Sequence, residues 1–573
     1  MGGVSAAQTA SPVRGGGVAQ RIVLGFGIAV LLVFVGYPLC WLALGALGLP
    51  HHFGFDGLMR SFTRPANLVP LTNTIILAAS AGLGSVAIGV PLAFAVARTD
   101  MALRRIVHAL AALAYILPPY LTAIAYIILL GPNAGYINRL TVWLTGTSMF
   151  NVMSAPGVAF VIIMHVFAYP YFLTSEALRV IDGTLEESAR MLGAARGSVL
   201  VRITLPLVAP AITGGALLAA VDSLALFGPQ AILGLPAQVV YLPTRIYAGM
   251  TSYPPRIAEA SALSLVLVVL TLAGLALQRR ALARRSFVTV AGKGVRATRW
   301  PLGAWRWPLG LLLAGVVVMA SAAPVGVLAV ASVSRVWTDA PWPSNLTLDH
   351  FRTAVLDNEI AVRGIANSLR LATAAATLAA FTGLAVAYLD QRTRLRGRRL
   401  LDYLAILPLG LPGTVLAVAL LQAFIRPPVV LYGTTWILLA AYVARSVPLS
   451  ARNANAALRQ LDVSLEEAAR VGGAGWLGTM RLILLPLLRP AMLTGWLLVF
   501  IPALGELSAT ILLYSSGTET ISVAIYRLND LGQLEVVAAL AMVLIGLILA
   551  AALLLQMLGG RGRIAARAAT PVT

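Results

Sequence analysis

The stretch that decides the fold is IDGTLEESARMLG at residues 181–193, because it returns as LDVSLEEAARVGG at residues 461–473. A Leu-Pro step follows each copy, in LPLVAP at 205–210 and in LPLLRP at 485–490. The whole block therefore repeats at a constant offset of 280 residues (461 minus 181). A long repeat of this kind is typical of a chain built from two copies of one structural unit.

The rest of the sequence is that of a membrane protein. Of 573 residues, 59% are hydrophobic and only 11% are charged, against about 25% charged in a typical soluble domain. A spanning helix needs about 20 mainly apolar residues, and about twelve segments qualify. They lie near 22–47, 70–97, 106–130, 155–178, 207–233 and 257–278, and near 307–333, 365–389, 401–425, 433–456, 487–514 and 533–558. We expect an all-α polytopic membrane protein with two parallel six-helix repeats.

Basic residues indicate the orientation. The net charge of +21 comes mostly from Arg, which gathers in loops on one side of the predicted spans, as at 98–105, 279–299 and 392–399. The positive-inside rule makes that side cytoplasmic and places both termini there. We interpret the Arg runs at 279–285 and 392–399 as topology signals that face anionic membrane lipid, and not as a nucleic-acid surface. The expected segments are 1–21, 22–69, 70–278, 279–306, 307–364, 365–558 and 559–573.

Resident cofactors and metals are not expected. The single cysteine, Cys40, lies in an apolar run, and the five histidines form no HxxxH pair. No thiolate metal site or intrachain disulfide can therefore form. The chain also lacks a GxxxxGK[ST] phosphate-binding loop, so it is not expected to bind ATP itself.

Each repeated block predicts a short helix and a fixed turn on the cytoplasmic side, between the fourth and fifth spans. LEESARML and LEEAARV are good helix formers, and Thr184 and Ser464 are predicted N-caps with acids in the following turn. Gly193 and Gly473 are placed to end these helices. Pro206 and Pro486 mark the start of the next ones. A short amphipathic helix with a fixed turn is suited to docking in a partner's groove.

These blocks resemble the EAA motif of binding-protein-dependent ABC importer permeases, roughly E-A-A, three residues, G, about nine residues, I-x-L-P. The match runs through Glu187, Ser188, Ala189, Gly193, Ile203, Leu205 and Pro206, and through Glu467, Ala468, Ala469, Gly473, Ile483, Leu485 and Pro486. Ser188 replaces the middle alanine. The resemblance implies the ABC type I importer permease fold in a bacterial inner membrane.

The same resemblance implies partners and roles. They are a dimer of cytoplasmic ATPase subunits, which would dock on these blocks and hydrolyse the ATP, and a periplasmic substrate-binding protein. The implied ATPase-coupling residues are Glu186, Glu187, Ala189, Gly193, Leu205 and Pro206 in the first copy, and Glu466, Glu467, Ala469, Gly473, Leu485 and Pro486 in the second.

The cargo is suggested by further likenesses. LALFGPQAILG at 224–234, LPTRIY at 242–247 and LGELSATILLYSSGTETISVAIY at 504–526 resemble the ferric-iron transport permeases. Related permeases for thiamine, polyamines, sulfate or phosphonates stay open as alternatives. Two acids within predicted spans, Asp222 and Glu506, are candidates for the translocation pathway, since intramembrane charges often mark one and hard oxygen ligands suit a hard cation. Alternatively, each bonds only to a neighbouring helix.

Two other protein classes share some of these sequence features. A major-facilitator secondary transporter also has twelve spans in two parallel halves, and DQRTRLRGRR at 390–399 faintly echoes its loop motif, but ARTDMALRR in the first half does not. That fold also has no helical loop between the fourth and fifth spans of both halves. A membrane enzyme would need clustered catalytic side chains, and none is visible in the sequence.

Overall fold

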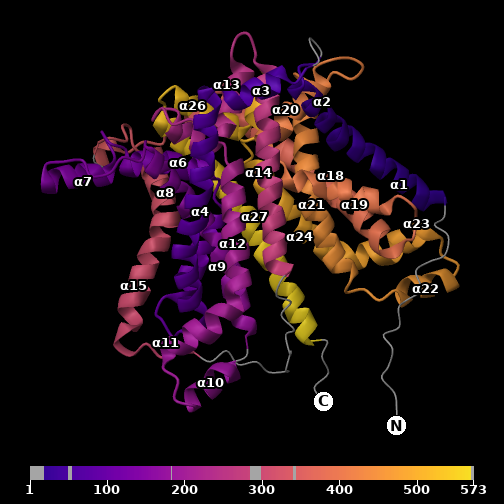
Figure 1. Cartoon of the computed structure of the whole chain (residues 1–573), viewed down its shortest axis with the longest axis horizontal. Coiled ribbons are helices and arrows are strands. Elements are labelled where there is room, and N and C mark those ends of the chain that lie inside the picture. The colour runs from indigo at the N-terminus through magenta and orange to yellow at the C-terminus, as the bar shows by residue number, and fades with distance from the viewer. Residues whose placement is uncertain (1–17, 50–53, 182, 284–298, 340–342, 569–573) are drawn as a thin grey trace.

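The computed structural model describes residues 18–49, 54–181, 183–283, 299–339 and 343–568, and these form helices joined by loops (Figure 1). We call 18–283 the first half and 299–568 the second half. The first half contains α1 Val18–Leu31, η1 Leu32–Gly36, α2 Tyr37–Ala46, α3 Asp56–Thr63, α4 Pro65–Arg98, α5 Arg104–Ile116, α6 Pro119–Leu130, α7 Tyr136–Thr145, α8 Ala155–Val166, α9 Ala168–Val180, α10 Gly183–Met191, α11 Arg196–Val199, η2 Leu200–Thr204, α12 Leu205–Ala225, η3 Gln230–Gly234, α13 Leu242–Thr251 and α14 Ile257–Ala283.

The second half repeats much of this order, but within its described residues it has no counterpart of α7, and the continuous α21 stands in place of α8 and α9. It contains η4 Gly303–Trp305, α15 Arg306–Val317, η5 Val318–Ala322, α16 Ala323–Ser332, η6 Pro343–Asn345, α17 Asp349–Arg352, η7 Thr353–Asp357, α18 Glu359–Arg392, α19 Arg398–Ile406, η8 Leu407–Gly410, α20 Gly413–Phe424, α21 Thr435–Leu458, α22 Ser464–Val471, α23 Trp476–Thr479, η9 Met480–Leu484, α24 Leu485–Leu504, α25 Thr510–Leu513, α26 Ile521–Asp530 and α27 Leu534–Ala568.

Most spans lie where the hydrophobic pattern predicts them, but the fifth and eleventh, Arg196–Ala225 and Trp476–Leu504, lie 8 to 11 residues earlier than the predicted 207–233 and 487–514. Nine helices within the described residues are long and apolar enough to cross a membrane, and two bent pairs raise the number to eleven. The remaining expected span, 433–456, corresponds to α21, whose 24 residues reach about 36 Å at 1.5 Å per residue. Arg445 and Arg452 make α21 more polar than the others. The all-α architecture is confirmed.

Proline breaks the third span of each half. The α5–α6 pair is bent by 108° and the α19–α20 pair by 118°. The first break contains Pro118 and the second contains Pro412, each with ψ near the extended region (129° and 145°). A proline lacks the N–H that would continue the helix, and it drives the preceding residue out of the α conformation. Both bends are therefore encoded locally.

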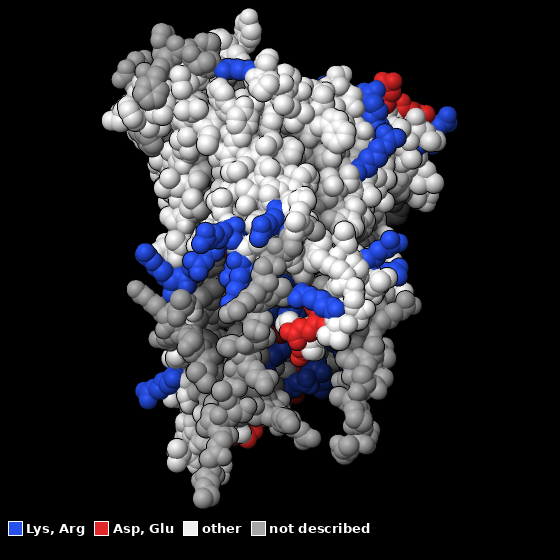
Figure 2. Space-filling view, turned by 90° about the vertical axis from the view of Figure 1, so that its right-hand side faces the viewer, with Lys and Arg blue, Asp and Glu red and all other residues white. Residues whose placement is uncertain are grey.

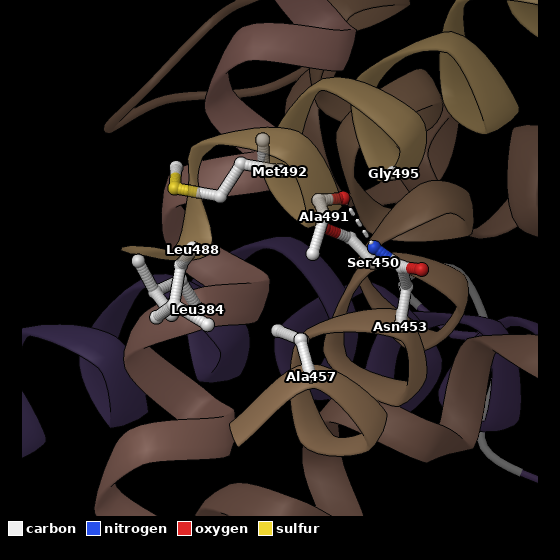
Figure 3. Close-up of a pocket in the computed structure, with 10 residues that line it drawn as sticks. Leu384, Ser450, Asn453, Ala457, Leu488, Ala491, Met492 and Gly495 are labelled. Atoms are coloured by element: carbon white, nitrogen blue, oxygen red, sulfur yellow. Dashed lines mark hydrogen bonds between the residues drawn. The ribbon is translucent and has the colours of Figure 1, made fainter. Parts of the chain in front are cut away.

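Glycines set the close packing of each half. A Cβ on Gly215 of α12 would lie 2.5 Å from Pro170 Cα of α9, and a Cβ on Gly383 of α18 would lie 2.5 Å from Ser450 Oγ of α21. Small residues let membrane helices approach in this way. Asn453 Nδ2 also donates to the Ala491 carbonyl of α24 at 2.7 Å, beside a cavity of about 10 Å³ between α18, α21 and α24 (Figure 3). That cavity has room for about one water molecule.

The first span of each half, its opening span, packs against the other half. The indigo α1–α2 segment packs on α18, α19 and α20, and α16 packs on α6 of the first half as well as on α27 (Figure 1). Tyr126 of α6 donates to the Met319 carbonyl of η5 at 2.6 Å, which supports the contact of the second opening span with the first half. A separate bond, from Gln422 of α20 to Ser261 of α14 at 2.7 Å, also joins the halves. Each opening span therefore packs on the opposite half as well as on its own.

The charged surface is banded. Figure 2 shows a broad uncharged area with Lys and Arg gathered in a band below it. Apolar surface bounded by basic side chains is typical of a protein whose cytoplasmic loops face anionic lipid. Among the described residues, α10 and α22 lie on the lower side of the bundle and α13 and α26 on the upper side (Figure 1).

Candidate functional site

Each repeated block contains the short helix that the sequence predicts. We call α10 and α22 the coupling helices. They end at Gly193 and Gly473, with φ of +87° and +82°, where an L side chain would be strained. The amides of Ala194 and Ala474 return to the carbonyls of Ala189 and Ala469 at 3.0 and 2.9 Å. The predicted glycine turns are therefore present in both halves.

The predicted N-cap of the second coupling helix is wrong. Ser464 is the first residue of α22 itself, and the Asp462 carboxylate instead accepts the Ser464 amide at 2.9 Å. This bond holds the pKa of the exposed Asp462 below its usual value. In the first half, α10 begins at Gly183, so Thr184 is its second residue.

The Leu-Pro steps lie inside continuous spans. Pro206 and Pro486 are the second residues of α12 and α24, as predicted, but α12 continues directly from η2 and α24 directly from η9. Both of these preceding turns are π-helical. A π turn widens the backbone, which gives room for a proline that lacks an N–H and crowds the carbonyl four residues earlier.

The first coupling helix is held by a buried carboxylate. Glu186 is 2% exposed and lies 3.7 Å from Nη2 of Arg98, the fully buried last residue of α4. Thr204 Oγ1 donates to Glu186 Oε1 at 2.8 Å, and Trp300 Nε1 donates to Oε2 at 3.4 Å. Arg98 also donates to the Ile181 carbonyl at 3.0 Å. We call this cluster the first anchor.

The second coupling helix has a related anchor. Glu466 is 1% exposed and lies 3.2 Å from Arg392 Nε at the end of α18. Tyr388 donates to Glu466 at 3.2 Å, and Arg470 of α22 lies 3.8 Å from it. Arg392 donates to the Leu461 carbonyl at 2.6 Å, as Arg98 does to the equivalent Ile181. We call this cluster the second anchor.

The anchors correct our interpretation of two arginines. Arg392 was predicted to be a topology signal facing lipid, and Arg98 was counted only among the basic residues of the cytoplasmic loops, yet both are buried ion-pair partners at the ends of α4 and α18. A signal was present in the sequence, because each begins an Arg-Thr pair after a predicted second span. Glu186 and Glu466 correspondingly point inward.

The outward faces of the coupling helices carry the remaining motif residues. Glu187 and Glu467 are exposed, and large apolar side chains lie beside them: Met191 and Leu192 are each 89% exposed, and Val471 is 90% exposed. Exposed apolar groups on a short rigid helix are typical of a docking surface. The sequence reasoning did not identify these three.

The two pathway candidates do not occupy equivalent positions. At the offset of 280 residues, Asp222 corresponds to Pro502, and Glu506 to Leu226. Asp222 lies three residues before the end of α12, and Glu506 lies two residues after the end of α24. Asp222 was expected midway along the fifth span and Glu506 within the equivalent eleventh span, but Asp222 lies near the end of α12 and Glu506 lies just after the end of α24.

Glu506 has a full set of partners. Its carboxylate accepts the amides of Ala509 and Thr510 at 3.0 Å each and the Thr510 hydroxyl at 2.6 Å, so it caps α25. It also forms an ion pair of 2.9 Å with Arg445 Nη1 of α21. The alternative that this acid bonds to neighbouring structure is thus realised.

Asp222 has polar neighbours from both halves. They are the Tyr169 side chain of α9 and, beyond ion-pair distance, Arg445 of α21. Asp222 and Tyr169 are half-buried, and Arg445 is 40% exposed. Within the part of the chain that the structure describes, no group of three His, Cys, Asp or Glu side chains is placed to hold a metal.

Comparisons with known proteins agree with this organisation. The family described as the binding-protein-dependent transport system inner membrane component matches residues 85–286 and 379–563. A putative ferric transport system permease protein, FbpB 1 of Haemophilus influenzae, is 30% identical over 86% of this chain and 77% of its own length. The ferric transport system permease protein FbpB of Actinobacillus pleuropneumoniae is 27% identical over 95% of this chain and 79% of its own.

Two further relatives match over less of the chain. A putative 2-aminoethylphosphonate transport system permease protein, PhnV of Salmonella typhimurium, is 30% identical over 39% of this chain and 84% of its own. A chain of a bacterial alginate ABC transporter is 20% identical, with a TM-score of 0.40, over 48% of this chain and 96% of its own. Because the family match includes both coupling helices and most of both halves, this chain belongs to the inner-membrane permease components of binding-protein-dependent ABC transport systems and is not their ATPase.

Proposed function

We propose that this permease imports ferric iron, and that its two coupling helices dock on a dimer of cytoplasmic ATPase subunits. The docking role is supported by one observation: each coupling helix has one buried side and one exposed side. Glu186 and Glu466 fix them to the spans, while Met191, Leu192 and Val471 are free to contact a partner. Because both anchors join the helix to the end of a long span, a push on the helix moves that span.

The proposed orientation follows from the same helices. If the ATPases dock on α10 and α22, that side is cytoplasmic and both termini lie there, as the basic loops predict. A periplasmic binding protein would then dock on the opposite side, where α13 and α26 lie (Figure 1).

Ferric iron is favoured by two relatives that cover most of this chain. The phosphonate relative covers only 39% of it, but phosphonate is kept as the second cargo. Oxygen side chains at the meeting of the halves, from Asp222 and Tyr169, are of the type that a hard cation prefers.

The docking role is tested with Gly193→Val and Gly473→Val together. The positive φ at both positions strains any β-branched residue, so the turns that present α10 and α22 should be lost. We expect co-purification of the ATPase subunits and ferric iron uptake to fall by about tenfold or more, a loss of at least 1.4 kcal/mol in coupling.

The matched control is Gly315→Ala with Gly326→Ala. Both glycines lie in helices of the seventh span with open space around a built Cβ, and both variants should assemble and transport normally. Full ATPase co-purification by the valine variant would refute docking through these helices. Uptake of a phosphonate and not of iron by the wild type would refute ferric iron as the cargo but would leave the docking role standing.

A further inference from the structure

The first half contains a helix, α7 Tyr136–Thr145, that has no counterpart among the described residues of the second half. It belongs to the connection between the third and fourth spans, after α6 ends at Leu130 and before α8 begins at Ala155. In Figure 1 it projects sideways from the bundle, across the direction of α4 and α15, and it lies lower than α3, α13 and α26. The helix therefore lies beside the upper ends of the spans and not above them.

Polar side chains fix α7 to the ends of two spans. Asn138, which is 1% exposed, donates to the carbonyls of Leu130 and Phe150 at 3.1 and 2.7 Å and accepts the Phe150 amide at 2.9 Å. Tyr136 donates to the Trp337 carbonyl at 2.5 Å, in the segment that follows the seventh span. The start of α7 is thus held by the end of α6 and by the second half.

One side of α7 is apolar along its whole length. Tyr136 and Ile137 begin this side and pack against the core. Leu140, Trp143 and Leu144 continue it at spacings of three and four residues, which place side chains on the same side of a helix. These three are 55%, 80% and 63% exposed. The apolar side therefore begins inside the protein and continues outside it.

The opposite side of α7 is mainly polar. It contains Asn138, Thr141 and Thr145, and both threonine hydroxyls donate to backbone carbonyls of the same helix, at 2.9 and 2.7 Å. Val142, which is 45% exposed, is the apolar exception on this side. A helix with one apolar and one polar side and an exposed tryptophan is typical of a segment that lies in the plane of a membrane interface.

Lipid fits this surface better than a binding protein does. A binding protein that docks where α13 and α26 lie would meet the uppermost helices, whereas α7 lies below them at the outer edge (Figure 1). The equivalent connection of the second half, 425–434, has no helix but exposes Ile425, Val429 and Val430 by 40–52%. Both halves are therefore apolar at this connection. Arg139 gives α7 a positive charge and its sequence contains no acid, which suits lipid phosphate.

We propose that α7 lies in the headgroup region of the membrane leaflet opposite the coupling helices, with Leu140, Trp143 and Leu144 among the upper parts of the phospholipid chains. In the proposed orientation this is the outer leaflet. Because α7 is bonded to the end of α6 and to the segment after α16, its contact with lipid holds those span ends at a fixed depth. The inference depends neither on the cargo nor on docking of the ATPase subunits.

A fluorescent label on single cysteines measures the lipid contact. In a Cys40→Ser background, Leu144→Cys places the label on the apolar side of α7, and Thr145→Cys places it on the polar side one residue away; both positions are exposed. The full chain with its ATPase subunits is placed in nanodiscs of phosphatidylethanolamine and phosphatidylglycerol that contain a lipid with a nitroxide high on its acyl chain. The nitroxide should quench the label at 144 about threefold more than the label at 145, because an interfacial helix buries its apolar side about 5–10 Å into the leaflet.

Charge on the apolar side should remove this difference. Leu140→Glu with Trp143→Glu places two carboxylates where lipid chains are expected, so the label at 144 should be quenched no more than the label at 145. The matched control is Leu140→Ile with Trp143→Phe, which keeps the side apolar and should keep the difference. Co-purification of the ATPase subunits should be unchanged in both variants, because α7 lies at the opposite end of the bundle from α10 and α22 (Figure 1).

Two outcomes would overturn the proposal. Equal quenching of the two labels by the lipid nitroxide, without the charged changes, would show that the apolar side of α7 does not face the membrane. Quenching of the label at 144 by aqueous iodide, with protection when the substrate-binding protein is added, would show that this side contacts protein instead. Neither outcome alters ATPase co-purification or ferric iron uptake by the wild type, so failure here is distinct from failure of the proposed function.

Discussion

The two anchors solve the same problem with different residues. Each buries a glutamate of the coupling helix against an arginine at the end of a long span, but the neutral side chains that donate to the glutamate differ. In the first anchor Thr204 and Trp300 donate to Glu186. In the second, position 484 is a leucine where the first has Thr204, and Tyr388 donates to Glu466. The ion pair is therefore the repeated element, and the neutral donors vary.

The anchors also differ in what covers them and in how far solvent reaches their arginines. Residues 299–302 cover the first anchor, where Trp300 pairs its backbone with Arg98 at 2.8 Å and packs its ring on Phe94 at 5.2 Å. Arg98 is consequently 0% exposed, whereas Arg392 is 11% exposed. The second anchor instead adds the charge of Arg470. We therefore expect loss of the ion pair to destabilise the first half more than the second.

The largest effect is expected for Arg98→Met. Removing one partner of a buried ion pair leaves the other charge uncompensated, at a cost of about 3–5 kcal/mol. The variant should show a large fall in thermal stability in detergent and lose ATPase co-purification. Arg98→Met with Glu186→Gln removes both charges and should recover most of the stability; a double variant as unstable as the single one would contradict the buried-pair account.

A smaller effect is expected for Arg392→Met. Glu466 keeps Arg470 and the Tyr388 hydroxyl, and solvent reaches the site, so the loss should be about 1.5–3 kcal/mol, that of bonds to a charged group. Thermal unfolding of this variant beside Arg98→Met measures the difference between the halves. Equal destabilisation by the two changes would remove the distinction drawn between the anchors.

The third effect in size is expected for Trp300→Phe. Phenylalanine keeps most of the ring packing on Phe94 but loses the indole donor to Glu186. Because that bond is long, 3.4 Å, we expect a cost of about 1 kcal/mol, below the usual value for bonds to a charged group. Adding Phe94→Tyr would place a hydroxyl at the position that Tyr388 occupies in the second half, at 294 residues' offset (388 minus 94). We expect that pair of changes to regain part of the stability, measured by thermal unfolding.

The sequence predicted the features that repeat in both halves, but it did not predict the contacts between distant segments of the chain. The spans, the coupling helices and the glycine turns follow from apolar run length, helix propensity and positive φ, which are local properties. Arg98, Trp300 and Arg445 act through partners at least 61 residues away. Periodicity and composition contain no information about such contacts, so the roles of Trp300 and Arg445 could not be predicted, and Arg98 was marked only by the Arg-Thr pair that recurs at Arg392.

The cap of the second coupling helix gives the smallest expected effect, and it depends on pH. The Ser464 amide holds the pKa of Asp462 below its usual value. A carboxyl whose pKa is lower in the folded state adds stability above its unfolded pKa of about 3.9 and loses it as pH falls through the folded value. Amide exchange of α22 should therefore be unchanged from neutral pH down to about pH 5 and should rise in more acidic solution. Asp462→Ala should show the faster exchange at every pH, because its cap is absent throughout. If wild type and variant exchange alike at neutral pH, the Asp462 bond does not secure the start of α22.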